Sequence, residues 1–104
     1  MGQFNAYENP SKASKRAYPY LLDIQSNLLE DLSTIVIPLC SMHFAEKAVI
    51  TKLCPILEVK GELFIAFTQQ VAGTHKNALG KEVCDLSYYR TEISTALDFS
   101  IAGI

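Results

Sequence analysis

The spacing of the hydrophobic residues changes near residue 86, and this change constrains the fold more than any other feature of the sequence. Before it, apolar and β-branched residues occur in short runs between polar breaks, which is typical of strands. After it, one face of a predicted helix carries Leu86, Ile93, Leu97, Ile101 and Ile104. Asp85 or Ser87 can cap the first turn of that helix. We therefore expect a strongly bent antiparallel sheet, or a partly open barrel, closed by one C-terminal helix.

Three runs in the first forty residues are predicted as strands: 3–7, 18–24 and 33–39. In the first run, Phe4 and Ala6 would share one side, with Gln3, Asn5 and Tyr7 on the other, as in a half-buried strand. Pro38 has no amide hydrogen to donate, so we expect it at a sheet edge or a strand end.

The clearest hairpin joins residues 54–59 to residues 62–70 through Lys60-Gly61, because glycine accepts the positive φ of a tight turn. Another strand is expected within 71–79. The segment 41–52 is ambiguous between a short helix and a loop.

The 104 residues indicate one domain, 1–104, and a hydrophobic content of 49% with 19% charged residues indicates a folded chain. No stretch approaches the roughly 18 apolar residues of a membrane span, and no signal peptide is recognisable, so we expect a cytoplasmic protein. A net charge of -2 disfavours a broad nucleic-acid surface but leaves a protein partner open.

Little in the sequence points to catalysis, and no cofactor is expected. The three cysteines, Cys40, Cys54 and Cys84, lie in apolar runs without a CxxC pair, so we interpret them as buried thiols. His43 and His75 lack the further ligands that a metal site needs. Glu58 and Glu62 flank the hairpin turn and should face solvent. The basic run 12–16 is interpreted as a solvated loop in preference to a phosphate contact.

The end of the predicted helix is unusual because its last turn contains Asp98 and no basic residue. Gly103 is a residue typical of helix ends. A partner site bearing arginine and apolar groups would complement such an anionic tip. Alternatively, Leu97, Ile101 and Ile104 pack on the chain's own sheet, which periodicity alone favours.

Five stretches in register resemble the CcdB family of bacterial toxins over nearly the whole chain. After the initial Gln3-Phe4 they are LDIQS (22–26), VIPL (36–39), LCPIL (53–57), EVCDLS (82–87) and the closing Gly103-Ile104. The resemblance implies a mainly β fold with α: an SH3-like barrel of antiparallel strands with a small extra sheet and a long C-terminal helix, forming a homodimer.

The resemblance also implies a function in a type II toxin-antitoxin pair. Such toxins bind the DNA gyrase A subunit and trap the gyrase-DNA cleavage complex, acting as a wedge and not as an enzyme, without a membrane or a sequence-specific nucleic acid as partner. A cognate CcdA-like antitoxin, disordered until it binds, would extract the toxin. By correspondence with the family, the gyrase-binding residues are Gln3, Phe4, Ser26, Asp98, Ile101, Ala102, Gly103 and Ile104.

The main departure from the family pattern is Ala102, where well-studied members carry a tryptophan that stacks on a gyrase arginine. Losing that stack costs on the order of 1–2 kcal/mol or more at a hot spot, although Phe99 could partly replace the ring. One alternative is therefore a non-toxic homologue that only binds antitoxin. The other is a ribonuclease toxin of the same fold, which the net charge disfavours.

Overall fold

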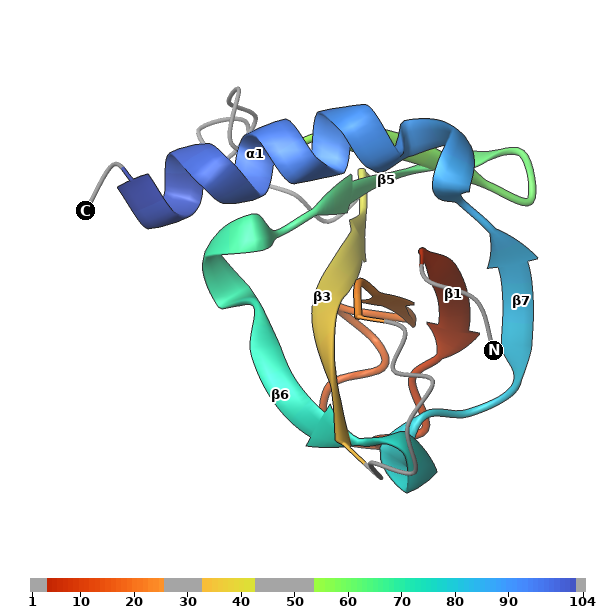
Figure 1. Cartoon of the computed structure of the whole chain (residues 1–104). Helices are drawn as coiled ribbons and strands as arrows, with labels where there is room; N and C mark the ends of the chain where they lie inside the picture. The colour runs from red at the N-terminus through yellow and green to blue at the C-terminus, as the bar shows by residue number, and fades with distance from the viewer. Residues whose placement is uncertain (1–3, 26–32, 43–53, 103–104) are drawn as a thin grey trace.

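The structure, a computed structural model, describes residues 4–25, 33–42 and 54–102. This part of the chain contains seven strands and one α-helix, with short 3-10 turns between them (Figure 1). The strands are β1 Asn5–Glu8, β2 Tyr20–Asp23, β3 Ser33–Ser41, β4 Ile56–Val59, β5 Glu62–Ala66, β6 Ala72–His75 and β7 Glu82–Asp85. The turns are η2 Thr68–Gln70, η3 Lys76–Ala78 and η4 Ser87–Tyr89, and the helix is α1 Arg90–Ala102.

All strand pairs are antiparallel, in the order β4-β5-β3-β2-β1-β7, with β6 also paired to β3. The sheet curls into a half-barrel and α1 lies across its open side, above β5 (Figure 1). The backbone amide of Glu58 on β4 donates to the Tyr89 hydroxyl just before α1, at 3.2 Å. The predicted mainly β architecture, an SH3-like barrel with a C-terminal helix, is confirmed.

The predicted hairpin is formed by β4 and β5, with Val59 opposite Glu62 across a two-residue turn. Lys60 and Gly61 have φ angles of 53° and 81°. Positive φ at both central positions defines a type I′ turn, whose twist matches that of the flanking strands. Glu58 and Glu62 are exposed beside this turn, as expected.

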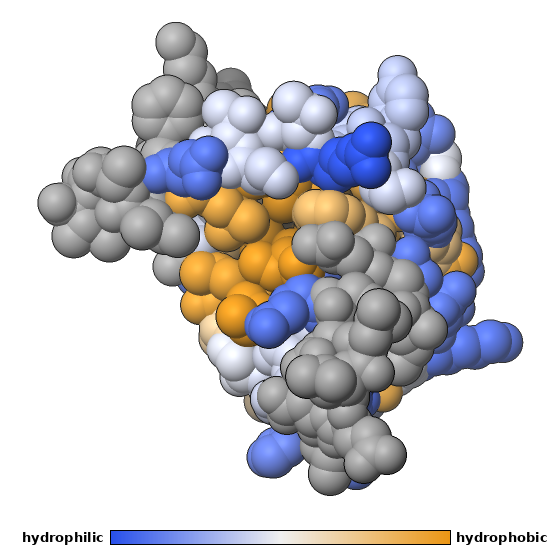
Figure 2. All heavy atoms as spheres, viewed as in Figure 1, coloured by the Kyte–Doolittle hydropathy of each residue, from blue (hydrophilic) through white to orange (hydrophobic). Residues whose placement is uncertain are grey.

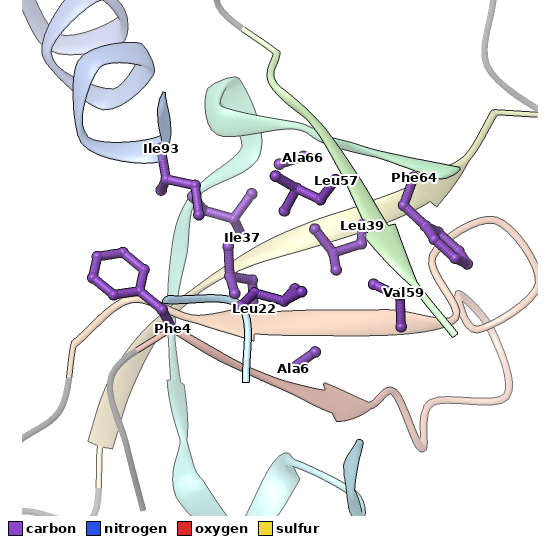
Figure 3. Packing of buried hydrophobic residues seen from close by; sticks show 11 residues of the cluster. Phe4, Ala6, Leu22, Ile37, Leu39, Leu57, Val59, Phe64, Ala66 and Ile93 are labelled. Carbon is purple, nitrogen blue, oxygen red and sulfur yellow. The ribbon is translucent and has the colours of Figure 1, made fainter. Parts of the chain in front are cut away.

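The main core fills the concave side of the sheet. Side chains from five strands meet Ile93 of α1 there (Figure 3). Leu22, Ile37, Leu39, Leu57 and Ile93 are fully buried. Because side chains alternate along a strand, Leu39 enters this core while Cys40 faces the other side. There Cys40 forms a second, smaller cluster with Cys54, Ile65 and Phe67.

The α-helix begins at Arg90, later than predicted, because the 3-10 turn η4 precedes it and leaves Leu86 outside the helix. The Asp85 carboxylate accepts a hydrogen bond from the Ser87 amide at 2.8 Å, which opens η4 and leads into α1. Hydrogen bonds from the Ser87 amide and hydroxyl hold the pKa of Asp85 below its ordinary value. On the inner face, Ile93 is fully buried and Leu97 half-buried, as periodicity predicts. Ala96 is also buried, at 1% exposure, and was not among the predicted contacts.

The expectation for Pro38 is wrong. Pro38 lies inside the nine-residue β3, opposite Leu21 of β2, and not at an edge or an end. Its carbonyl accepts the Phe67 amide at 3.1 Å, so its backbone faces the side where β3 changes partner from β6 to β5. A missing amide hydrogen at that junction removes no hydrogen bond to β2, which explains why proline is tolerated.

The first predicted strand is observed as β1, and Phe4 and Ala6 both lie in the main core as predicted. The strand begins only at Asn5, because Phe4 has φ 68°. The predicted exposure of Tyr7 is wrong. Its side chain lies on the opposite face of β1 from Ala6, yet it is only 4% exposed.

Strand β7 was not predicted, since Glu82 and Asp85 at its ends are charged. The predicted strand 71–79 is observed as β6, and residues 43–52 of the ambiguous segment lie outside the described residues.

Glycine at position 80 allows the chain before β7 to approach β1. The Gly80 amide donates to the Glu8 carbonyl at 2.8 Å, and a Cβ at Gly80 would lie 2.7 Å from that oxygen. We therefore expect Gly80→Ala to lower the free energy of unfolding by about 1–3 kcal/mol, because the backbone must shift. Gly73→Ala is the matched control, since its Cβ would meet its nearest atom at 3.9 Å. Denaturant titration measures both, and equal stabilities would contradict the close approach.

Candidate functional site

The structure describes part of the set predicted to bind gyrase. The side chains of Phe4 and Asp98 are described, and Ile101 and Ala102 are placed as backbone in the last turn of α1. The remaining predicted residues, Gln3, Ser26, Gly103 and Ile104, lie outside the described residues.

The C-terminal part of α1 extends past the sheet. Figure 1 shows the last turns of the helix projecting beyond β3 and β6. Before these turns, Ala96 is buried, Leu97 is half-buried and Asp98 is exposed. The last turn contains no basic residue. A helix C-terminus already carries a partial negative charge, so Asp98 makes this end of the molecule locally anionic.

The Phe4 side chain packs in the main core, and the Phe4 backbone is hydrogen-bonded to two other segments of the chain. Its ring is 8% exposed and belongs to the main cluster (Figure 3). The Phe4 amide donates to the Asp23 carbonyl at 2.6 Å, and the Leu86 amide donates to the Phe4 carbonyl at 2.8 Å. The positive φ of a bulky residue costs free energy, and these two hydrogen bonds hold it in place. Phe4, the residue after Gln3 in the chain, is therefore held between Asp23 and Leu86.

A buried carboxylate holds the end of β2, just before Ser26. Asp23 is 1% exposed, and its Oδ1 accepts hydrogen bonds from the Thr34 hydroxyl at 2.7 Å and the Gln25 amide at 3.0 Å. The Thr34 hydroxyl also lies 2.7 Å from the Gln25 carbonyl. Since the Asp23 backbone binds Phe4, one residue anchors the segments leading to both Gln3 and Ser26. The sequence gives no signal for this network, because Asp23 and Thr34 are eleven positions apart.

An apolar patch lies below α1 and beside its C-terminal part (Figure 2). The patch is formed by residues of β3, β6 and α1, with the residue after β2 and the residue before β6. These residues are Ile24, Ile35, Val71, Ala72, Gly73 and Leu97. Ile35 and Val71 are each 37% exposed, which is high for aliphatic side chains that adjoin one another. We call this surface the Ile35–Val71 patch. Adjoining exposed apolar side chains make this patch a candidate interaction surface.

The described residues include three cysteines and one histidine, the side-chain types most often used as nucleophiles and acid-base groups. Cys40 and Cys54 are buried and Cys84 partly buried, as expected for structural thiols. Burial raises the pKa of the Cys40 thiol. Burial and the negative charge of Asp85 raise the pKa of the Cys84 thiol. Both thiols are therefore protonated at neutral pH. His75 is exposed, and the described residues contain no group of three His, Cys, Asp or Glu side chains suited to a metal.

The described residues contain no helix long and apolar enough to cross a membrane.

Comparison with known proteins identifies a family and a fold. The family model described as CcdB protein matches residues 3–103. Among solved structures, an endoribonuclease in complex with its cognate antitoxin, from a mycobacterial species, is similar with a TM-score of 0.76 and 11% identity, covering 98% of this chain and 95% of that one. A second similar structure, described as an endoribonuclease from a mycobacterial species, has a TM-score of 0.74 and 11% identity, covering 98% of this chain and 91% of that one. At this identity the likeness is one of fold.

The Asp23 network yields a stability test. Thr34→Val removes the hydroxyl that bridges Asp23 and Gln25 while keeping the shape of the side chain. We expect a loss of about 1–3 kcal/mol in the free energy of unfolding, because a buried carboxylate loses a partner. Amide hydrogen exchange at Phe4 and Gln25 should accelerate as well. Thr74→Val, the residue opposite Thr34 on β6, is the matched control. Unchanged exchange in the Thr34 variant would contradict the anchoring role.

Proposed function

Because the chain belongs to the CcdB family, we propose that it is the toxin of a type II toxin-antitoxin pair that binds the DNA gyrase A subunit and traps the gyrase-DNA cleavage complex. The observation that carries this proposal is the end of α1, which projects beyond the sheet and is anionic at Asp98. An element that leaves its own core in this way is suited to enter an opening in a partner.

The proposed toxin acts as a wedge and performs no chemistry itself. It binds one state of gyrase, the state with cleaved DNA, more tightly than the others, and so raises the population of that state. The anionic helix end would meet a basic site on gyrase, since charge-assisted hydrogen bonds to arginine are strong and specific. Catalytic residues on the toxin are not required for this mechanism.

The contact residues divide into two groups by their surroundings. Asp98, Ile101, Ala102, Gly103 and Ile104 form the helix end and would contact gyrase directly. Gln3 and Ser26 would contact gyrase beside the helix end. Phe4 is buried, so its contribution is to position Gln3.

A homodimer would present two helix ends to the two-fold symmetric gyrase subunit pair. The Ile35–Val71 patch is the surface we assign to that dimer, because it is apolar and adjoins Leu97 on the helix that carries the proposed contact residues. Joining two copies there would bring the two helix ends close together. It would also remove exposed Ile35 and Val71 from water.

A cognate antitoxin is the third proposed partner. The similar endoribonuclease was solved together with its cognate antitoxin, and we extend that mode of regulation to this chain. Because gyrase acts on the chromosome, the toxin and antitoxin would meet in the cytoplasm.

The gyrase mechanism is tested by cleavage of plasmid DNA in the presence of purified gyrase. We expect the full chain to stabilise the cleavage complex and deletion of residues 102–104 to abolish this effect while circular dichroism stays unchanged. Asp98→Asn should weaken the effect by about tenfold, whereas Glu92→Gln, the same charge change in the first turn of α1, should not. Ala102→Trp should increase it by adding a stacking ring.

Three outcomes of this experiment would reject the proposal. Equal DNA cleavage by the full and truncated chains would exclude the helix end as the contact. Cleavage of messenger RNA without gyrase would identify a ribonuclease toxin. Antitoxin binding without gyrase trapping or growth arrest would identify a non-toxic homologue.

The dimer assignment is tested by measuring molar mass in solution. Ile35→Glu places a charge in the Ile35–Val71 patch and should shift the protein to monomer, because the charge would be buried without a partner. Ile56→Glu is the matched control, since Ile56 on β4 is 41% exposed, close to the 37% of Ile35. A wild-type monomer at high concentration, or a dimer that survives Ile35→Glu alone, would contradict the assignment.

A further inference from the structure

A hollow lies where β1 ends and β2 begins. It has a volume of about 770 Å³ and is lined by residues 8–10, 12, 15, 16, 19, 20 and 80. We call it the basic-loop cleft. Small-molecule sites in proteins are typically about 300–1,000 Å³. Neither the proposed gyrase contact nor the proposed dimer surface uses this cleft.

The loop along one side of the cleft has a fixed shape. Asn9 is 8% exposed, and its amide nitrogen donates to the Ser14 hydroxyl at 3.0 Å and the Tyr18 carbonyl at 2.8 Å. Its amide oxygen accepts the Ser11 amide at 3.0 Å. Backbone hydrogen bonds from Lys15 to Ser11 and from Tyr18 to Ser14 complete a turn. A loop ordered in advance loses less entropy when a ligand binds.

This turn carries three positive side chains to the cleft. Lys12, Lys15 and Arg16 are exposed, and within the described part of the chain none of them forms an ion pair or a side-chain hydrogen bond. Only one acidic residue, Glu8, lines the same cleft. The cleft therefore has a positive balance in a chain whose net charge is -2. An anion is the ligand that this arrangement favours.

Another part of the cleft wall is apolar and aromatic. It consists of Pro10, Pro19 and the half-buried Tyr20, whose ring is held by an edge contact to Phe64 at a centroid distance of 5.1 Å. Burial chiefly, with the charges of Glu62 and Glu8, raises the pKa of Tyr20, so its hydroxyl stays a hydrogen-bond donor at neutral pH. A planar ring of a ligand can pack on this wall while its charged groups face the loop.

We propose that the basic-loop cleft binds a nucleotide, with its phosphates on Lys12, Lys15 and Arg16 and its base against Tyr20 and the two prolines. Arginine and lysine together suit phosphate, since arginine supplies a planar pair of donors and lysine a point charge. A long nucleic acid is disfavoured as the occupant, because its affinity depends on many phosphate contacts and the chain is acidic overall.

The proposal is tested by isothermal titration of the purified chain at low salt with ADP, GDP, adenosine and inorganic pyrophosphate. We expect one of the two nucleotides to bind at least about tenfold more tightly than adenosine or pyrophosphate, because only a nucleotide uses both walls. The double variant Lys15→Gln/Arg16→Gln should weaken nucleotide binding by about tenfold or more. Lys60→Gln/Arg90→Gln removes two charges outside the cleft and should leave it unchanged.

Three results would overturn the proposal. The first is the absence of saturable nucleotide binding, and the second is equal nucleotide binding by the two double variants. The third is equal binding of pyrophosphate and nucleotide, because this would indicate an adventitious anion only. Tighter binding of a short single-stranded oligonucleotide than of either nucleotide would also overturn it. Because the readout is binding without gyrase, failure here leaves the gyrase proposal standing, and the reverse also holds.

Discussion

Hydrogen bonding along β3 is the constraint on which the rest of the structure depends. Its nine residues pair with β2 on one side and, on the other, with β6 near Ser33 and with β5 near Ser41. The strand therefore forces the sheet to curl, and the concave side that results is filled by Ile37, Leu39 and the helix residue Ile93. Pro38 lies at the change of partner, where an unused donor would otherwise be costly to bury. A strand with a single partner on that side would not need a proline there.

The same strand links the fold to the candidate site. Thr34 on β3 binds the buried carboxylate of Asp23, and the Asp23 carbonyl binds the strained Phe4. Burying a carboxylate is unfavourable unless it is hydrogen-bonded, and here the Thr34 hydroxyl and the Gln25 amide supply those hydrogen bonds. The arrangement is understandable as a device that holds two loops in one position. The described neighbours of Gln3 and Ser26 in the chain, Phe4 and Gln25, are thus both hydrogen-bonded to Asp23.

Local signals made the hairpin and the helix predictable, whereas long-range contacts decided the rest. Lys60-Gly61 and the spacing of Ile93 and Leu97 act within a few residues, so the sequence was sufficient to predict them. The burial of Tyr7, the existence of β7 and the network at Asp23 depend on segments far apart in the chain. Ala96 was missed because a small residue contributes little to a periodic pattern, even when it is fully covered. The family resemblance supplied the predicted contact residues, which no periodicity could have selected.

The similar endoribonucleases share the fold with this chain at 11% identity, so most side chains at any site differ and the fold alone does not transmit their chemistry. The topology bears on this point. RNA cleavage requires an acid-base group beside positive charges that hold the phosphates. His75 pairs with Ser33 at the start of β3, while the basic loop leads into Tyr20, which pairs with Leu39 six positions further along. At about 3.3 Å per residue these points are about 20 Å apart. His75 is therefore far from the basic loop along β3, while Glu8 is the acid-base group that lines the cleft together with Lys12, Lys15 and Arg16.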